Sequence, residues 1–418
     1  NLQAFPFGQE PKPHWAALAQ KIGLPLINLQ AGGIQNNGKN IYILPGSSSA
    51  FQKNGTLIGQ SQPFGSELQT VSLASPALKH SNPDPIAART QALLYGLQKF
   101  LKQTGLNKVV VGLSGGIDSA VSATLFRQIL PPENLLLINM PSQFNSQTTQ
   151  NLSRQLAENL GCLYTVLPIG ESLNLTVQQL EKAELENLGI GQKQHLQIKP
   201  FVTENIQARD RSARILAAAA AAFGGAFSCN ANKSEMTIGY GTMYGDLAGF
   251  VAPLADLWKF QVYETARYLN SQASHELIPQ GILEVKPSAE LSPEQAVDEG
   301  KGDPLVYPYH DYLFRSWVEN GLSPAELLAY YQEGSLAAQI GCSPELPSQL
   351  FSQPADFIKD LEKWWNLFCG LSVAKRIQAP PLVSLSCRAF GSEYPEAQNG
   401  VYYSQAYLKL KEQVLNHA

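Results

Sequence analysis

The stretch VVVGLSGGIDSA at residues 109–120 decides the fold of this chain. Three valines predict a buried strand, two glycines allow the sharp turn after it, and apolar residues at helical spacing then predict a helix. This junction gathers backbone N–H groups and the positive end of a helix dipole at one point, which favours an anion such as phosphate. Ser114 and Ser119 add hydroxyl donors. Asp118 adds a carboxylate, which suits a phosphate site if it holds Mg²⁺.

Strands and helices alternate after this turn. Strand patterns occur at 135–138, 163–167 and 226–229, and helix patterns at 148–160 and 203–223. The alternation predicts an α/β fold with a doubly wound parallel sheet. Ligands bind beyond the carboxyl ends of the strands in such sheets. We therefore expect Ser114, residues 140–142 and residues 230–235 to line one crevice.

The composition of the 418 residues excludes several classes of protein. The net charge of −4 gives no basic face, so we expect no nucleic-acid partner. No apolar run approaches the roughly 18 residues of a membrane helix. The five cysteines are scattered, which indicates reduced thiols in a cytoplasmic protein. The first residue is Asn1, which suggests a processed chain or a piece of a longer one.

The remaining segments show less pattern. Residues 1–75 do not have the composition of a complete domain, although a helix near 15–21 and strands near 24–29, 40–44 and 56–58 are expected. Residues 72–85 are rich in serine, proline and asparagine and predict a linker, placed at 76–85. The polar stretch 286–308 fits either a mobile lid or a surface loop, and 323–365 is expected to be helical.

Two other motifs compete for function. GIQNNGKN at residues 33–40 nearly spells a Walker A loop, but Asn40 stands where Ser or Thr would bind Mg²⁺, so a turn between strands is favoured. GLSGG at 112–116 matches the G-x-S-x-G nucleophile elbow. A serine hydrolase would need a later histidine, and the candidates are His195, His275 and His310.

Several motifs together resemble a known family. SGGIDS at 114–119 resembles the pyrophosphate-binding loop of the N-type ATP pyrophosphatases. Later motifs resemble NAD synthetases in the same order: MPSQFNS at 140–146, ENIQAR at 204–209, NKSEMTIGY at 232–240, YGD at 244–246, PLAD at 253–256, PSAEL at 287–291, KRIQAPP at 375–381 and RAFG at 388–391. The resemblance extends from about residue 83 to the end of the chain.

The resemblance implies a domain organisation of the glutamine-dependent type. An adenine nucleotide alpha hydrolase-like synthetase domain would span 86–335, and a helical tail at 336–418 would contribute to its site. Residues 1–75 would be the C-terminal portion of a nitrilase-like glutaminase, beyond its nucleophile, joined by the linker 76–85. No cysteine precedes Cys162, so we expect this polypeptide not to hydrolyse glutamine. The nitrogen donor would be ammonia, or glutamine through a missing glutaminase part.

The same resemblance assigns residues by role. Asp118 and Lys259 would be catalytic, and Asp118 and Glu235 would hold Mg²⁺. ATP would be bound by Gly112, Ser114, Gly115, Gly116, Asp118, Ser119, Met140, Asn230 and Lys259. Deamido-NAD would be bound by Asn205, Gln207, Arg209, Glu235 and Lys375. Without the resemblance, Asp118 is a helix N-terminal charge, Glu235 a surface acid and Lys259 a solvated helix residue.

One departure from the family concerns the residues before NKSE. Cys229-Asn230-Ala231 stands where the bacterial pattern has T-T-G. An amide can still donate a hydrogen bond, so altered detail is expected and not lost activity. Cys229 itself fits a small buried hydrophobe.

The expected reaction is an ATP-dependent amidation. The nicotinate carboxylate of deamido-NAD would attack the α-phosphorus of ATP, and ammonia would then displace AMP. The alternatives are a serine hydrolase using Ser114 and a catalytically silent nucleotide-binding module. A homo-oligomer without membrane contact is expected.

Overall fold

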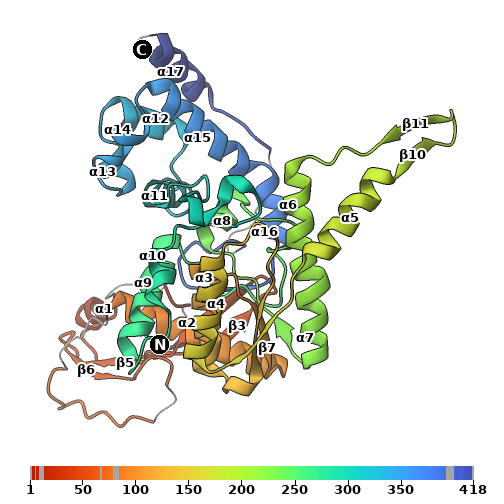
Figure 1. Ribbon diagram of the computed structural model, residues 1–418. Helices are drawn as coiled ribbons and strands as arrows, with labels where there is room; N and C mark the ends of the chain where they lie inside the picture. Colours follow the sequence, from red (N-terminus) through yellow and green to blue (C-terminus); the bar gives the residue numbers. More distant parts are fainter. Residues whose placement is uncertain are drawn as a thin grey trace. The chain divides into compact units, whose positions relative to one another are not determined.

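A computed structural model describes residues 2–4, 6–8, 14–65, 68–78, 84–391 and 400–416 (Figure 1). The chain divides into two compact units. The first consists of Asn1–Asn107 and Pro381–Ser392, and the second of Lys108–Pro380 and Glu393–Ala418. Half of the expected linker, residues 79–83, lies outside the described residues.

The first unit contains two small sheets. One has the order β1-β2-β5-β6, from β1 (Leu2–Gln3), β2 (Leu26–Gln30), β5 (Ser49–Phe51) and β6 (Leu57–Gln60). Helix α1 (His14–Ile22) contributes Ala19 to a core with Leu26, Phe51 and Leu57. The expected helix and strands of this region are confirmed.

The other sheet joins distant parts of the sequence. Strand β4 (Asn40–Pro45) lies between β3 (Gly32–Asn36) and β13 (Leu382–Ser384), antiparallel to the first and parallel to the second. The Walker-like run 33–40 is therefore part of a hairpin, and the predicted turn is confirmed.

Helix α2 (Pro85–Thr104) belongs to this first unit. Asp84 caps its N-terminus and Gly105 ends it in a left-handed conformation. Gly96 lets the helix approach the sheet, because a Cβ there would lie 3.0 Å from Val383 and 3.1 Å from Ile43. We expected the synthetase domain to begin at residue 86, which lies in this helix. The limits of that family module stay a prediction, since compact units and family modules are different divisions of a chain.

The second unit is built on a parallel sheet with the order β12-β7-β8-β9. Its strands are β7 (Val109–Gly112), β8 (Leu135–Asn139), β9 (Leu163–Val166) and β12 (Ala226–Phe227). Helices α3 (Ile117–Ile129) and α4 (Gln147–Leu160) connect the first three, with a short η1 (Pro132–Asn134) before β8. The predicted doubly wound α/β fold is confirmed.

Strand β12 is shorter than the predicted 226–229. The Ser228 N–H still donates to the Val110 carbonyl, but the Cys229 N–H donates to the carbonyl of Val251 and so leaves the sheet. Strands β8 and β9 follow β7 on one side of it, and β12, which comes last in the sequence, pairs with β7 on its other side. Such a reversal is where open α/β sheets bind ligands. The segments after β7 and β12 lie there, and the Asn230 amide bridges them by donating to the Gly112 carbonyl at 3.1 Å.

The segment between β9 and β12 differs from its prediction in two places. After α5 (Gly170–Lys182) the chain forms a hairpin of β10 (Glu184–Asn187) and β11 (Gln192–His195), where no strand was predicted (Figure 1). Gly191, at φ +69°, permits its tight turn. The helix predicted at 203–223 begins earlier, as α6 (Pro200–Arg209), and continues through a π-helical segment η2 (Asp210–Leu216) into α7 (Ala217–Phe223).

The rest of the second unit is helical. Its elements are α8 (Lys233–Ile238), α9 (Lys259–Gln272), α10 (Gln280–Glu284), η3 (Pro293–Gln295), η4 (Val297–Glu299), α11 (Tyr307–Val318), α12 (Pro324–Gln332), α13 (Leu336–Ile340), α14 (Leu346–Leu350), α15 (Pro354–Cys369), α16 (Leu371–Gln378) and α17 (Gln405–Asn416). The expected helical stretch at 323–365 is confirmed. Among the described residues, no helix is both long and apolar enough to cross a membrane.

Candidate active site

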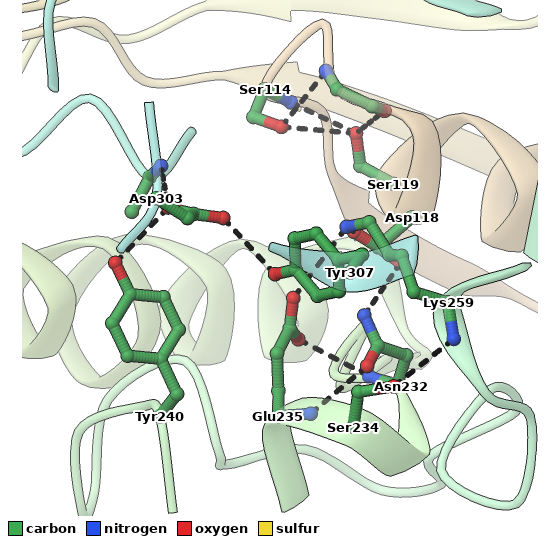
Figure 2. A network of polar contacts seen from close by, with 12 residues as sticks. Ser114, Asp118, Ser119, Asn232, Ser234, Glu235, Tyr240, Lys259, Asp303 and Tyr307 are labelled. Atoms are coloured by element: carbon green, nitrogen blue, oxygen red, sulfur yellow. Dashed lines mark hydrogen bonds and ion pairs between the residues drawn. The ribbon is translucent and has the colours of Figure 1, made fainter. Parts of the chain in front are cut away.

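Hydrogen bonds of its own serine hydroxyls hold the loop between β7 and α3 in shape (Figure 2). The Ser119 hydroxyl donates to the Gly116 carbonyl at 3.0 Å and accepts from the Ser114 N–H at 3.2 Å. The Ser114 hydroxyl accepts from the Gly116 N–H at 3.2 Å. Gly115 has φ +85°, and a Cβ there would lie 2.1 Å from the Thr149 carbonyl oxygen. Glycine is therefore required at the tightest point of the loop.

Two carboxylates and one lysine meet below this loop, from three different helices (Figure 2). The Lys259 ammonium lies 2.5 Å from Asp118 and 3.7 Å from Glu235. Asp118 is at the start of α3, Glu235 in α8 and Lys259 at the start of α9. Lys259 is only 3 % exposed, so the interpretation of this residue as a solvated helix residue is wrong.

The pKa values in this cluster are shifted in a consistent way. Burial raises the pKa of the Glu235 carboxyl well above its ordinary value, and the negative charge of Asp118 raises it further, while Lys259 lowers it. Burial alone would lower the pKa of Lys259, but the carboxylates of Asp118 and Glu235 outweigh burial and raise it. Lys259 therefore stays charged at neutral pH, and Glu235 takes a proton more readily than an exposed glutamate.

Helix α8 orients Glu235 through a capping box. The Asn232 side chain accepts from the Glu235 N–H at 3.0 Å, and the Glu235 carboxylate accepts from the Asn232 N–H at 3.2 Å. The Asn232 amide group also donates to Asp118 at 3.0 Å. Asn232 thus joins the two carboxylates, a role not predicted from the sequence although the N-x-x-E spacing of a capping box could have indicated it.

Asp303 and two tyrosines form a second polar group beside these residues, and Asp303 and Tyr240 line the same pocket (Figure 2). The hydroxyls of Tyr240 and Tyr307 donate to the Asp303 carboxylate at 3.0 and 3.1 Å. The Lys259 ammonium lies 4.9 Å from the centre of the Tyr307 ring, a cation–π contact. Burial and then the nearby Asp303 raise the pKa of Tyr240, so its hydroxyl stays protonated.

The polar stretch 286–308 contributes to this pocket and contacts α4. The Glu290 carboxylate is buried and accepts from the Thr149 hydroxyl at 2.6 Å and from the Ser146 N–H at 3.0 Å. Glu290 also has a left-handed backbone, with φ +47°. The stretch is thus held at the pocket, as a wall and not as a detached surface loop.

Most of the expected ATP-binding residues line one pocket of about 260 Å³ in the second unit. Those on its wall are Gly112, Ser114, Gly116, Asp118, Ser119, Met140, Asn230 and Lys259, together with Glu235. Gly115 is absent from the wall because it packs against Thr149. The structure brings this predicted set together.

The other residues expected to bind deamido-NAD do not line the pocket in the described structure. Asn205 donates to the Phe201 carbonyl of its own helix at 2.7 Å, and Gln207 donates to Leu291 at 2.9 Å. Arg209 donates to the Met243 carbonyl at 3.2 Å. Their roles stay predictions.

Lys375 instead fixes the chain after α8. Its ammonium donates to the carbonyls of Gly239 and Gly241 at 2.7 and 2.6 Å. Helix α16 approaches closely there, since a Cβ on Gly239 would lie 2.8 Å from Ser372. The predicted contact of Lys375 with deamido-NAD is not tested by this arrangement.

Arg211 is a pocket residue that the sequence analysis missed. Its guanidinium donates to the Met140 carbonyl and to the Asn145 side chain, both at 3.0 Å. Burial lowers its pKa to about 10, so it stays charged. Arg211 lies in the π-helical segment, whose wider turn changes the direction of side chains relative to an α-helix.

The three histidines considered for a hydrolase lie elsewhere. His275 contacts the Asn159 carbonyl at 3.3 Å, and His310 contacts Asp360 at 3.3 Å. His195 is on the exposed hairpin strand β11. No histidine lines the pocket within the described part of the chain, so Ser114 has no imidazole base there.

The sheet order, the glycine–serine loop and the pocket define an α/β protein of the adenine nucleotide alpha hydrolase-like fold. The chain belongs to the NAD synthase family, which matches residues 89–339. It is 32 % identical over 383 residues to a glutamine-dependent NAD(+) synthetase from Synechocystis sp., covering 90 % of this chain and 60 % of the relative. It is 36 % identical over 249 residues to the enzyme of that name from Thermotoga maritima, covering 59 % and 41 %.

The chain thus spans about half the length of the curated relatives it matches. Two solved structures share the fold. A glutamine-dependent NAD(+) synthetase from Cytophaga hutchinsonii has a TM-score of 0.70 at 16 % identity, covering 99 % of this chain and 70 % of that one. The enzyme from Acinetobacter baumannii, solved with ADP, has a TM-score of 0.56 at 23 % identity, covering 96 % and 67 %.

Proposed function

We propose that this protein amidates deamido-NAD to NAD, using ATP and releasing AMP and pyrophosphate. The observation that supports this most strongly is that the side chains of Asp118, Glu235 and Lys259 lie together beside the Ser114–Ser119 loop. This loop lies where the strand order of the sheet reverses. Membership of the NAD synthase family supports the same reaction.

The described residues suggest how each step is assisted. The N–H groups of the loop and the hydroxyls of Ser114 and Ser119 bind the β- and γ-phosphates. The nicotinate carboxylate attacks the α-phosphorus, and pyrophosphate leaves into the loop. Lys259 stabilises the charge that develops on the phosphate oxygens. Ammonia then attacks the adenylated carbonyl carbon and AMP departs, without a covalent enzyme intermediate.

Asp118 and Glu235 fit a magnesium ion. Their carboxylates are hard oxygen ligands. The raised pKa of Glu235, due to burial and then to Asp118, indicates two carboxylates crowded at one point where a divalent cation would relieve the repulsion. When bound, the ion would neutralise charge on the phosphates of ATP.

The binding of Mg²⁺ in the presence of ATP is expected to weaken on acidification, beginning at a higher pH than for a site with an ordinary glutamate. Glu235 has a raised pKa, so it gains a proton on acidification earlier than an ordinary glutamate, and the protonated form is a poor ligand. Titration of Mg²⁺ at fixed ATP by calorimetry measures the change. ATP also titrates, so Glu235→Gln is the control: its pH dependence should be weaker than that of the wild type. Equal pH dependence in both proteins would remove Glu235 from the metal site.

One assay separates the proposed reaction from its alternatives. The protein is mixed with ATP, Mg²⁺, deamido-NAD and ammonium chloride, and AMP and NAD are measured. Equimolar AMP and NAD support the proposal. Binding of ATP without AMP would indicate a silent module, and turnover of activated esters without ATP would indicate a hydrolase.

Replacing Ser114 by alanine is expected to reduce NAD formation by only about tenfold. The variant loses one acceptor for the Gly116 N–H and one phosphate donor, while the rest of the loop remains. If Ser114 were instead a nucleophile, its replacement by alanine would end turnover. Steady-state kinetics with ATP therefore distinguish a phosphate ligand from a nucleophile, and complete inactivity of a folded Ser114→Ala protein would contradict the proposal.

The nitrogen source is proposed to be ammonia, or glutamine if a glutaminase part acts with this chain. The curated relatives named glutamine-dependent support the second route. Repeating the assay with glutamine in place of ammonium chloride tests it. A homo-oligomer and a cytoplasmic location stay predictions.

A further inference from the structure

Asp311 is a completely buried carboxylate outside the pocket wall. It lies on α11, one turn after Tyr307, and α11 packs against both α8 and α9. Its Oδ1 accepts a hydrogen bond from the Ser234 hydroxyl at 2.5 Å, and its Oδ2 accepts from the Phe260 N–H at 2.9 Å. A buried carboxylate is costly unless it is well hydrogen-bonded, so these contacts need an explanation.

Ser234 continues the chain of contacts to Lys259. Its hydroxyl proton goes to Asp311, and its oxygen accepts from the Lys259 N–H at 3.1 Å (Figure 2). The first two N–H groups of α9 are thus bound by one hydroxyl and one carboxylate. The Trp258 side chain accepts no capping hydrogen bond, although the Gln261 side chain accepts from the Trp258 N–H at 3.0 Å. Asp311 and Ser234 supply the partners that a cap would provide.

Helices α8 and α9 each carry a residue of the pocket wall, and α11 carries a residue that contacts Lys259. Ser234 precedes Glu235 on α8, Lys259 is the first residue of α9, and Tyr307 begins α11. Burial raises the pKa of Asp311, the hydrogen bonds from Ser234 and Phe260 oppose that rise, and the result is a pKa of about 6, so the carboxyl is mostly ionised at neutral pH.

We propose that Asp311, acting through Ser234, is a positioning residue that fixes the start of α9 and so holds the Lys259 ammonium between Asp118 and Glu235. Its importance for turnover rests on the proposed function. Its effect on Lys259 does not, because the position of that ammonium can be measured without substrates.

The test is competitive acetylation of Lys259 by trace acetic anhydride, measured by mass spectrometry against the exposed Lys193. The Lys259 side chain is 3 % exposed and its ammonium is ion-paired with Asp118, so it should be labelled slowly in the wild type. The Asp311→Asn side chain cannot accept the Ser234 proton while keeping its bond to the Phe260 N–H, so Lys259 should move away from the carboxylates. Its labelling should then rise severalfold. Ser234→Ala removes the acceptor for the Lys259 N–H and should act in the same direction.

The matched control is Asp360→Asn. Asp360 binds His310, the neighbour of Asp311 on α11, at 3.3 Å and accepts from Trp364 at 2.8 Å, and it lies outside the pocket wall. Its loss perturbs the same helix without touching Ser234 or α9. Faster Lys259 labelling in Asp311→Asn or Ser234→Ala, but not in Asp360→Asn, supports the proposal. Unchanged labelling in the folded variants, or an equal rise in the control, overturns it. If Asp311→Asn does not fold, Ser234→Ala decides.

The kinetic readout is independent. If the synthetase assay is positive, Asp311→Asn should lower kcat by about tenfold with little change in the KM for ATP, because the phosphate loop is intact while Lys259 is displaced. If the wild-type protein makes no NAD in that assay, the proposed function is refuted. The labelling result for Lys259 would still stand.

Discussion

Replacing Asp118 by asparagine is expected to lower pyrophosphate release from ATP and deamido-NAD by about 10³-fold. Asparagine has nearly the same shape and can still accept from Asn232, so the fold should persist. It cannot neutralise Lys259, which lies 2.5 Å away and is 3 % exposed, and it is a poor ligand for Mg²⁺. Replacing Asp118 leaves the buried Lys259 ammonium with only the more distant Glu235 carboxylate, at 3.7 Å, and so shifts the charge balance at the proposed phosphate site.

The measurement is pyrophosphate release at saturating Mg²⁺, with circular dichroism to establish folding. Glu171→Gln is a matched control, because Glu171 is also an acid in the first turn of a helix, α5, but lies outside the pocket wall. If Asp118 were only a charge at a helix N-terminus, both variants would release pyrophosphate nearly as fast as the wild type. Undiminished release by Asp118→Asn would therefore restore that interpretation and remove Asp118 from the mechanism.

The phosphate loop could be predicted from the sequence because its determinants are local. Consecutive valines, glycines at the turn and serines five residues apart define a strand, a loop and a helix start without reference to the rest of the chain. The parallel direction of the strands follows from their alternation with helices, since parallel strands require crossovers. Residues 112–119, 140 and 230 could thus be placed at one edge.

Burial and distant pairing could not be predicted in the same way. Nothing near Lys259 in the sequence shows that its ammonium is buried, because its partner Asp118 is 141 residues away. Asp303 lies in a polar stretch without period, so its binding of two tyrosine hydroxyls has no local signal. Arg211 lines the pocket from the π-helical segment that begins at Asp210, and the resemblance that pointed to Arg209 gave no signal for Arg211.

Gly115→Ala is expected to reduce kcat/KM for ATP by about 10²-fold. A methyl group there would lie 2.1 Å from the Thr149 carbonyl oxygen, whereas ordinary contacts begin near 3.4 Å, so the loop would shift by 3.4 − 2.1, about 1.3 Å. A displacement of about 1 Å at a reacting centre can cost about 10²-fold in rate. The positive φ of +85° adds about 1–2 kcal/mol of backbone strain. ATP binding by calorimetry and pyrophosphate release should both decline.

Gly161→Ala separates the steric effect from the strain. Gly161 ends α4, the helix that carries Thr149, and has φ +64°, but a Cβ there meets nothing within 4 Å. The Gly161→Ala protein should therefore lose about as much stability as Gly115→Ala. Its kinetics with ATP should stay close to those of the wild type. Equal kinetic losses in the two variants would mean that backbone strain in this region, and not the shape of the phosphate loop, limits the reaction. A Gly115→Ala protein with wild-type affinity for ATP would show that the phosphates do not bind at this loop.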